Sequence, residues 1–177
     1  MEVRPRAMHA FLCSFILLAA SASAQTIGVA AYQEGKDKDL KPEAFLNSLV
    51  SGCMDELFFS GYIATSDKVL SLSAAEYKQG AQIKLEAARQ ASIAYEVEIL
   101  VSVSKSSFSK TLLIPNRAEY RFVDIKSGKI LVQGALQGME DGEDVQARID
   151  AWCVRASKEI MPACLGKVAG VSQKVES

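Results

Sequence analysis

The segment from Tyr95 to Ser104 restricts the fold more than any other, because apolar residues alternate there with mostly polar ones. The apolar positions share one side of an extended chain: Tyr95, Val97, Ile99, Val101 and Val103. Alternation with a period of two is typical of a β-strand that buries one face and leaves the other polar. We therefore expect a long strand here and a fold organised around a β-sheet.

Helical periodicity precedes this strand twice. Apolar residues between positions 45 and 58 repeat at i, i+1, i+4 and i+5, the stripe of an amphipathic helix that packs on a core. Pro42 suits the first turn of this helix, and Gly61 suits its C-terminal end. Residues 73–76 match a capping box and predict a second helix that runs to about Gln90.

Acidic residues at positions 141–144 predict the start of a last helix, since carboxylates favour the positive end of the helix dipole. Apolar residues then recur at helical spacing: Val145, Ile149, Trp152, Cys153, Ala156 and Ile160. Pro162 is expected to break or kink this helix and to leave residues 163–168 as a short final turn.

Four more segments are predicted as strands: residues 26–32, 62–65, 117–125 and 130–136. The last two flank residues 126–129, whose composition is typical of a hairpin turn. The serine-rich segment 104–116, which contains Pro115, is expected to be a loop or a loose edge.

The predicted elements follow one another in the order β-α-β-α-β-β-β-α. Crossovers through helices imply that the first three strands are parallel, while the hairpin adds antiparallel strands at one end. We therefore predict an α/β fold, with a single-domain mixed β-sheet of about five strands covered by helices.

Residues 1–24 have the composition of a secretory signal peptide, with a basic head, an apolar run at 10–18 and an A-x-A cleavage site at 22–24. Cleavage there predicts Gln25 as the first residue of the mature chain. The apolar run is short for a helix that must span about 30 Å, so a retained anchor is the weaker alternative. Lipidation at Cys13 is also disfavoured, because most of the apolar stretch would then follow the lipid.

These features divide the chain into a cleaved signal peptide at 1–24, a single α/β domain at 25–170 and a flexible tail at 171–177. We expect the protein to be periplasmic or secreted, with no integral membrane segment after cleavage. The net charge of −1 shows no basic excess, so no nucleic-acid partner is expected.

The single histidine, His9, lies in the leader, so the mature chain is expected to have none. That excludes Ser-His-Asp and Cys-His catalysis and His-containing metal sites. The sequence has no G-x-S-x-G, P-loop or G-x-G-x-x-G motif, and the acidic run at 140–144 lacks the spacing of a calcium loop. We therefore predict a protein that is not an enzyme, with no catalytic, cofactor-binding or metal-ligating residues.

Three cysteines follow the leader: Cys53, Cys153 and Cys164. An exported protein can form disulfides, but three thiols allow one pair at most. Cys153 and Cys164 would pair only if Pro162 folds the chain back, because an unbroken helix would separate them by about 16 Å. A bond from Cys53 would require the first and last helices to be neighbours. The alternative is that all three are buried as small hydrophobic residues.

Apolar residues also occur within and beside the serine-rich segment: Phe108, Leu112, Leu113 and Ile114. If the segment is exposed, these residues form a possible partner surface, because exposed apolar patches often mark binding sites. The alternative is an edge strand tucked under a helix.

Three segments resemble a superfamily of bacterial envelope proteins: Ile27-Gly28-Val29-Ala30, residues 94–103, and the hairpin at 121–131, which is similar to an L-V-D-x-x-T-G-x-I hairpin. The superfamily contains the curli secretion channel protein, the penicillin-binding-protein activator lipoproteins and the N-terminal domain of the Tol–Pal β-propeller protein. The resemblance implies a non-enzymatic α/β domain that docks on other envelope proteins. Many relatives are lipoproteins, whereas this leader has no convincing lipidation site, and residues 102–106 lack the glycine that often follows the family's central strand.

We therefore predict an exported bacterial envelope protein that acts through contacts with an envelope protein partner, as an accessory or assembly factor. A periplasmic small-molecule or glycan binder is an alternative, with a site near Tyr62, Tyr95 and Tyr120. A carboxylate-based hydrolase is a third. A shallow apolar pocket beside an exposed sheet edge would favour the first, a deep cavity with converging tyrosines the second, and a close pair of buried carboxylates the third.

Overall fold

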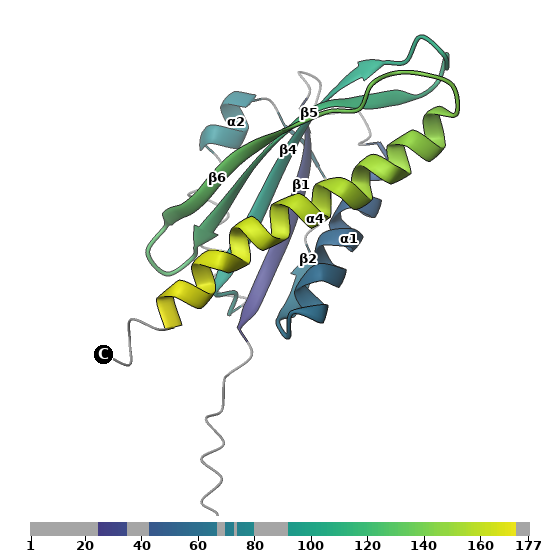
Figure 1. The fold of residues 1–177 in the computed structure, drawn as a ribbon. Helices are drawn as coiled ribbons and strands as arrows, with labels where there is room; N and C mark the ends of the chain where they lie inside the picture. Colours follow the sequence, from purple (N-terminus) through teal and green to yellow (C-terminus); the bar gives the residue numbers. More distant parts are fainter. Residues whose placement is uncertain (1–24, 35–42, 67–69, 73, 80–91, 173–177) are drawn as a thin grey trace, which may run out of the picture.

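The computed structural model describes residues 25–34, 43–66, 70–72, 74–79 and 92–172 (Figure 1). The elements are β1 (Thr26–Glu34), α1 (Phe45–Phe59), β2 (Ile63–Ser66), β3 (Leu70–Leu72), α2 (Ala74–Gln79), β4 (Tyr95–Lys105), β5 (Leu113–Asp124), β6 (Lys129–Gln137) and α4 (Val145–Ser172). The strands form one mixed sheet in the order β2-β1-β4-β5-β6, and β3 pairs with β1 beyond the end of β2. The predicted α/β class and mixed sheet are confirmed, and the short strand β3 is an addition that the sequence did not predict.

The strand directions also agree with the prediction. β1 is parallel to β2, with Thr26 opposite Ile63, and parallel to β4, with Ile27 opposite Tyr95. β5 is antiparallel to both β4 and β6. The β5–β6 turn contains Gly128 with a positive φ of 70°, a conformation that glycine adopts without steric cost.

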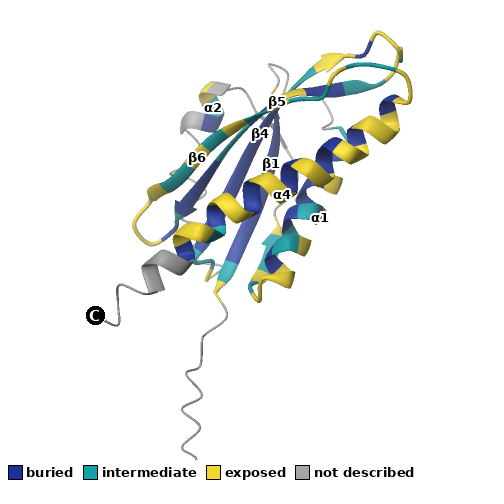
Figure 2. Cartoon of the chain, in the orientation of Figure 1, coloured by how far each residue is buried: buried dark blue, intermediate teal, exposed yellow. Residues whose placement is uncertain are grey.

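α1 and α4 lie side by side over one face of the sheet, and their inward sides are buried (Figures 1 and 2). The two helices approach closely at Gly52, where an added Cβ would lie 2.9 Å from Ser157 Oγ. Phe45 meets Trp152 edge to face, with ring centroids 6.2 Å apart. The main core therefore forms where the apolar stripes of both helices meet the apolar face of the strands.

The prediction of a loop or loose edge is wrong for both ends of segment 104–116. β4 continues to Lys105, and β5 already begins at Leu113, which is the register partner of Lys105. Pro115 lies within β5 opposite Val103, beside a register shift in the β4–β5 pair. A bulge is one of the few places where a strand tolerates a residue without an N–H, so the proline does not end the strand.

The predicted end of the last helix at Pro162 is also wrong, since α4 continues through this residue to Ser172. Pro162 has no N–H to donate to the carbonyl of Lys158, one turn earlier in the helix. Both residues are exposed, so this carbonyl lies on the solvent side of α4. Met161 and Cys164 are buried in the core on the other side of the helix. Packing of that side therefore outweighs the hydrogen bond that the proline removes.

α2 covers part of the opposite face of the sheet, where Tyr77 packs with Tyr32 and Leu100 in a second, smaller core. The predicted second helix is described only over α2, and its remainder to Gln90 lies outside the described residues, as do Pro42, the leader and residues 173–177. Among the described helices, none combines the length and the apolar character needed to cross a membrane.

Candidate functional site

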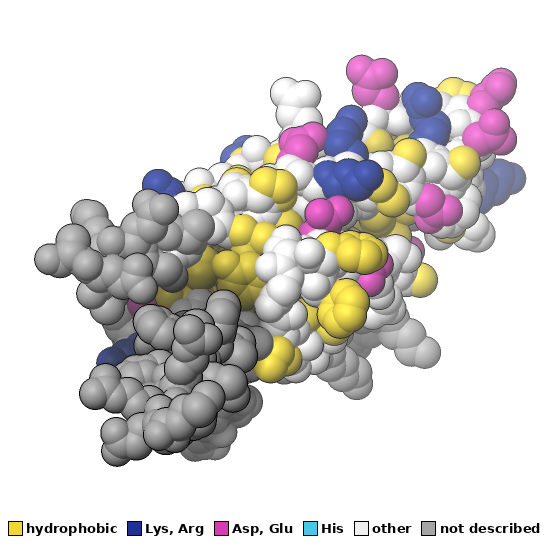
Figure 3. Space-filling model, turned by 60° about the horizontal axis from the view of Figure 1, so that its bottom comes forward, with side chains coloured by type: hydrophobic (Ala, Val, Ile, Leu, Met, Phe, Trp, Pro, Cys, Tyr) yellow, Lys and Arg dark blue, Asp and Glu magenta, His cyan; other side chains and the backbone are white. Residues whose placement is uncertain are grey.

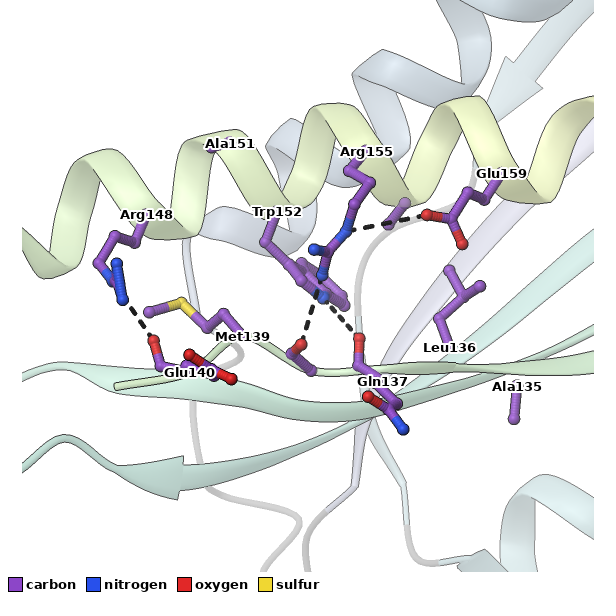
Figure 4. A pocket seen from close by; sticks show the side chains of 12 residues that line it. Ala135, Leu136, Gln137, Met139, Glu140, Arg148, Ala151, Trp152, Arg155 and Glu159 are labelled. Carbon is purple, nitrogen blue, oxygen red and sulfur yellow. Dashed lines mark hydrogen bonds and ion pairs between the residues drawn. The ribbon is translucent and has the colours of Figure 1, made fainter. Parts of the chain in front are cut away.

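The strand β6 and the helix α4 flank a groove of about 720 Å³ (Figure 4). One side is formed by the end of β6 and the residues that follow it to Glu140, and the other by α4 between Arg148 and Glu159. Trp152 and Arg155 point from the helix towards the strand (Figure 4). The side of α4 that faces this groove borders the apolar stripe that packs the helix on the sheet.

Side chains of α4 hold the backbone of the groove. Trp152 Nε1 donates a hydrogen bond to the carbonyl of Gln137 at 3.0 Å, and Arg155 Nη2 donates to that of Gly138 at 3.3 Å. Arg148 Nε donates a hydrogen bond to the carbonyl of Glu140 at 3.3 Å. The segment after β6 is therefore fixed to the helix, which gives the groove a rigid floor.

The groove carries both signs of charge at its rim. Arg155 and Glu159 form an exposed ion pair with 3.8 Å between Nε and Oε1, and Arg148 and Glu140 lie at the other end (Figure 4). An exposed pair of this kind contributes little to folding stability, because water screens it. These side chains can therefore rearrange around a partner at small cost.

β6 is an edge of the described sheet, since it pairs with β5 and with no other described strand. Half of its backbone N–H and C=O groups therefore point away from β5. Its side chains are half-buried or exposed along its whole length, and Ile130 is 43% exposed. An extended segment of another chain can add to such an edge as a further strand.

The β4–β5 turn at residues 106–112, called the hairpin tip below, is held by one carboxylate. Asp141 accepts hydrogen bonds from Ser106 Oγ at 2.7 Å and from the backbone N–H and Oγ of Ser107 at 2.5 and 2.7 Å. These bonds lower the pKa of Asp141 to about 2, with the backbone N–H of Ser107 contributing most. The sequence predicts only a solvated helix start at 140–144, so it gives no sign of this contact.

The predicted partner surface is divided between surface and core. Phe108 is 59% exposed at the hairpin tip, Leu112 and Leu113 are half-buried, and Ile114 is buried. Phe108 and Leu112 border a second groove of about 770 Å³, whose other side is the first turn of α4 at Val145. Only the residues nearest the tip are therefore placed to meet a partner.

Of the three tyrosines considered for a small-molecule site, Tyr95 lines a third pocket of about 410 Å³, whereas Tyr62 and Tyr120 line none of these three pockets. Tyr95 is buried and stacks on Phe122, with ring centroids 5.2 Å apart. Tyr120 packs over Gly134, where an added Cβ would lie 2.5 Å from Tyr120 Oη, and Tyr62 packs against the main core. Burial raises the pKa of Tyr95 and of Tyr120, and all three side chains pack in or against the core.

An ion pair is buried on the other face of the sheet, where the alternation predicts exposed side chains. Arg121 of β5 pairs with Glu98 of β4, and its guanidinium lies 4.2 Å from the ring centroid of Tyr77. Arg121 Nη2 also donates a hydrogen bond to the Tyr77 carbonyl at 2.8 Å. Glu96 is buried on the same face. Because Glu98 is engaged by a guanidinium, this cluster does not offer the pair of free carboxylates that a hydrolase needs.

The three cysteines are buried free thiols in this structure. Burial raises the pKa of Cys53, Cys153 and Cys164 to about 12 each, which keeps them protonated near neutrality. α1 and α4 are neighbours, as a bond from Cys53 would require, and the pairing itself stays a prediction. In the described part of the chain, no group of three or more His, Cys, Asp or Glu residues could hold a metal ion.

No protein-family model matches the chain, and no curated protein matches it by sequence. Several solved structures are similar to it at low identity. PelC from Paraburkholderia phytofirmans, a dodecamer, is 13% identical over 81% of this chain and 90% of that chain, with a TM-score of 0.43. TolB from Acinetobacter baumannii is 12% identical over 83% of this chain and 29% of that chain, with a TM-score of 0.46.

The LpoB C-terminal domain from Escherichia coli is 13% identical over 67% of this chain and 84% of that chain, with a TM-score of 0.39. TolB and LpoB are among the envelope proteins whose hairpin the sequence resembles. The solved structures similar to this chain therefore include envelope proteins of the kind that the sequence resembles.

Proposed function

We propose that this chain is an exported, non-enzymatic protein of a bacterial envelope, and that a partner protein adds an extended segment to the edge of β6. The observation that carries this proposal is that the groove beside α4 includes the last three residues of β6, an edge strand of the described sheet. A shallow apolar pocket beside a sheet edge is the kind that we expect of a protein-binding module. This groove meets the edge condition, while its rim carries the charged residues Glu140, Arg148, Arg155 and Glu159.

The groove supplies what strand addition needs besides backbone hydrogen bonds. Ala151 on α4 is small and exposed, so it leaves room for side chains of the added strand. Ala135 on β6 is also small and exposed, and its side chain points away from α4 (Figure 4). Trp152 is buried beneath the groove and holds its base in place through the hydrogen bond to Gln137. Arg155 and Glu159 at the rim can set the direction of the incoming segment by charge.

The hairpin tip is the second part of the proposed contact. Its groove follows the first one along α4, and its exposed Phe108 can anchor a partner that already occupies the β6 edge. The partner surface proposed from the sequence then keeps Phe108, Leu112 and Leu113, while Ile114 supports them from the core.

Two other functions receive less support from the geometry. A small-molecule or glycan site would need converging tyrosines, and those considered are engaged in packing. A carboxylate-based hydrolase would need two free, close acids, and Glu98 is held by Arg121.

Site-specific photocrosslinking in the producing bacterium tests the interface. A photoreactive residue at Ala151, in the groove, is expected to give an adduct with one partner, whereas one at Ala163, exposed on α4 outside the groove, is not. Ala135→Lys in the Ala151-labelled chain should abolish the adduct, because a lysine on an edge strand opposes pairing with a further strand. Ala163→Lys in the Ala151-labelled chain should leave the adduct intact.

Equal adducts from both labelled positions, or an Ala151 adduct that survives Ala135→Lys in a folded chain, would contradict strand addition. Export is tested separately. The mature protein recovered from the envelope should begin at Gln25 by mass spectrometry, and an intact leader in the cytosol would contradict that part of the proposal.

A further inference from the structure

α1 ends in two adjacent exposed phenylalanines. Phe58 is 74% exposed and Phe59 is 83% exposed, and Ile63 at the start of β2 is 53% exposed. The two rings meet edge to face, with centroids 6.2 Å apart. We call these three residues the aromatic patch. Single exposed apolar residues are common, but three within six positions form a surface that points to a binding role.

The aromatic patch is displayed on a fixed helix end. Gly61, with a positive φ of 83°, ends α1, and its N–H donates to the Phe58 carbonyl at 3.0 Å. The N–H of Tyr62 donates to the Leu57 carbonyl at 3.1 Å. These bonds cap the helix in the manner of a C-terminal glycine motif. The phenylalanines therefore need no ordering before they bind, which lowers the entropic cost of binding.

The aromatic patch lies where the leader joins the domain. The N–H of Ile63 donates to the carbonyl of Gln25 at 3.2 Å, and Thr26 of β1 is the register partner of Ile63. The apolar run of the leader ends at residue 18, so the residues up to Gln25 can span about 25 Å at most. The signal peptide that the sequence predicts would therefore hold this end of the domain at the bilayer before cleavage.

The charged residues near the aromatic patch are of both signs, so they do not favour a highly charged partner. The β5–β6 turn, which lies at the same end (Figure 1), carries the exposed Lys126 and Lys129, while α1 carries Asp55 and Glu56 just before the aromatic patch. Figure 3 shows apolar side chains gathered on this end, with few charges among them. Apolar insertion, rather than electrostatic attraction, is the interaction that this surface favours.

We propose that the aromatic patch inserts into the interfacial layer of a phospholipid bilayer and holds the processed domain on the membrane with this end down. Aromatic rings suit the boundary between headgroups and acyl chains. This surface is separate from the β6 edge, so the domain can dock on lipid and bind a partner protein at once. The proposal rests on the export proposed above and not on the contact at β6.

Flotation with phosphatidylcholine vesicles tests the proposal, using the exported, processed chain with its N-terminus checked by mass spectrometry. The double variant Phe58→Ser with Phe59→Ser is expected to lower the partition coefficient by about tenfold or more, because it removes two inserted rings. Val154→Ser, a matched loss of an exposed apolar residue on α4 (54% exposed), is expected to change it by less than about twofold. Added phosphatidylglycerol should have little effect.

A depth measurement keeps the test independent of variant folding. Phe59→Trp should add a fluorescence signal that brominated lipid quenches, whereas the signal added by Val154→Trp should not be quenched. The parent chain, with its buried Trp152, gives the background for both. Absence of vesicle binding, or equal binding by the double variant and the parent chain, would overturn the proposal. So would concentration-dependent self-association that the double variant abolishes without any vesicle binding, which would assign the aromatic patch to a second copy.

Discussion

Arg121 on β5 lies directly opposite Glu98 on β4 in the sheet register, and the two side chains form an ion pair that is almost fully buried. Tyr77 of α2 completes the cluster, because its ring lies under the guanidinium and its carbonyl accepts a hydrogen bond from it. The pair therefore links β4 and β5 to α2, on the face of the sheet opposite α1 and α4.

Removing one partner of this pair should destabilise the fold strongly. Arg121→Met leaves the Glu98 carboxylate buried without its partner, and we expect a loss of about 3–5 kcal/mol in the free energy of unfolding. Glu98→Leu combined with Arg121→Met should recover most of this loss, because the uncompensated charge is gone. Urea unfolding followed by circular dichroism measures both. A single variant as stable as the parent chain would show that the pair is not buried in solution.

The thiols should be unreactive in the folded protein. Burial and a pKa of about 12 at Cys53, Cys153 and Cys164 leave little thiolate to attack a disulfide reagent near neutral pH. Ellman's reagent should label less than one thiol in the native protein during the time in which urea-unfolded protein is labelled fully. Three thiols after unfolding would show a reduced chain, whereas one would show that a disulfide forms during export. Rapid labelling of the folded chain would contradict the burial of these residues.

Stability should fall in alkaline solution. The folded pKa of Cys53 is about 12, above the ordinary value of 9.0, so the unfolded state ionises first. The stabilising difference is therefore present below about pH 9 and is lost as pH rises towards 12. Urea midpoints measured across this range should decline, and Cys53→Ala should make the decline shallower. An unchanged slope in that variant would assign the alkaline loss to other groups.

Asp141 should control the hairpin tip through its hydrogen bonds with Ser106 and Ser107. Asp141→Ala is expected to speed amide exchange at Ser107, whose N–H loses its acceptor. Because the folded pKa of Asp141 is lowered to about 2, its contribution is present above the ordinary value of 3.8 and is lost as pH falls towards 2. Asp55→Asn, on the exposed side of α1, is the control and should leave the tip unchanged. Exchange at Ser107 that is equal in all three proteins would contradict this anchoring.

Two glycines should respond in opposite ways to substitution by alanine. At Gly138 an added Cβ would lie 2.2 Å from the Pro115 carbonyl oxygen, so Gly138→Ala should destabilise the fold by about 1–3 kcal/mol. At Gly166, exposed within α4, nothing lies within 4 Å, and alanine should stabilise the helix by about 0.5–1 kcal/mol. Thermal unfolding measures both. Equal effects of the two substitutions would mean that the backbone at Gly138, just after β6, does not approach Pro115 of β5 this closely.

The sequence alone determined the elements whose periodicity is local. The alternation from Tyr95 to Val103, the stripe of α1 and the glycine at the β5–β6 turn predict β4, the first helix and the hairpin, because each signal is carried within one segment. The mixed α/β sheet then follows from their order. The apolar residues around Phe108 predict a possible partner surface, but the sequence does not show which of them lie at the hairpin tip and which lie in the core.

Only the tertiary structure decided the features that depend on two distant segments meeting. Pro162 stays inside α4 because its neighbours Met161 and Cys164 are buried in the core. Pro115 stays inside β5 because it lies beside the register shift in the pairing of β5 with β4. The Arg121–Glu98 pair, the Asp141 anchor and the groove along β6 likewise join residues far apart in the chain. Their physical cause is packing between elements, whose free energy overrides local preference and leaves no signal in either segment alone.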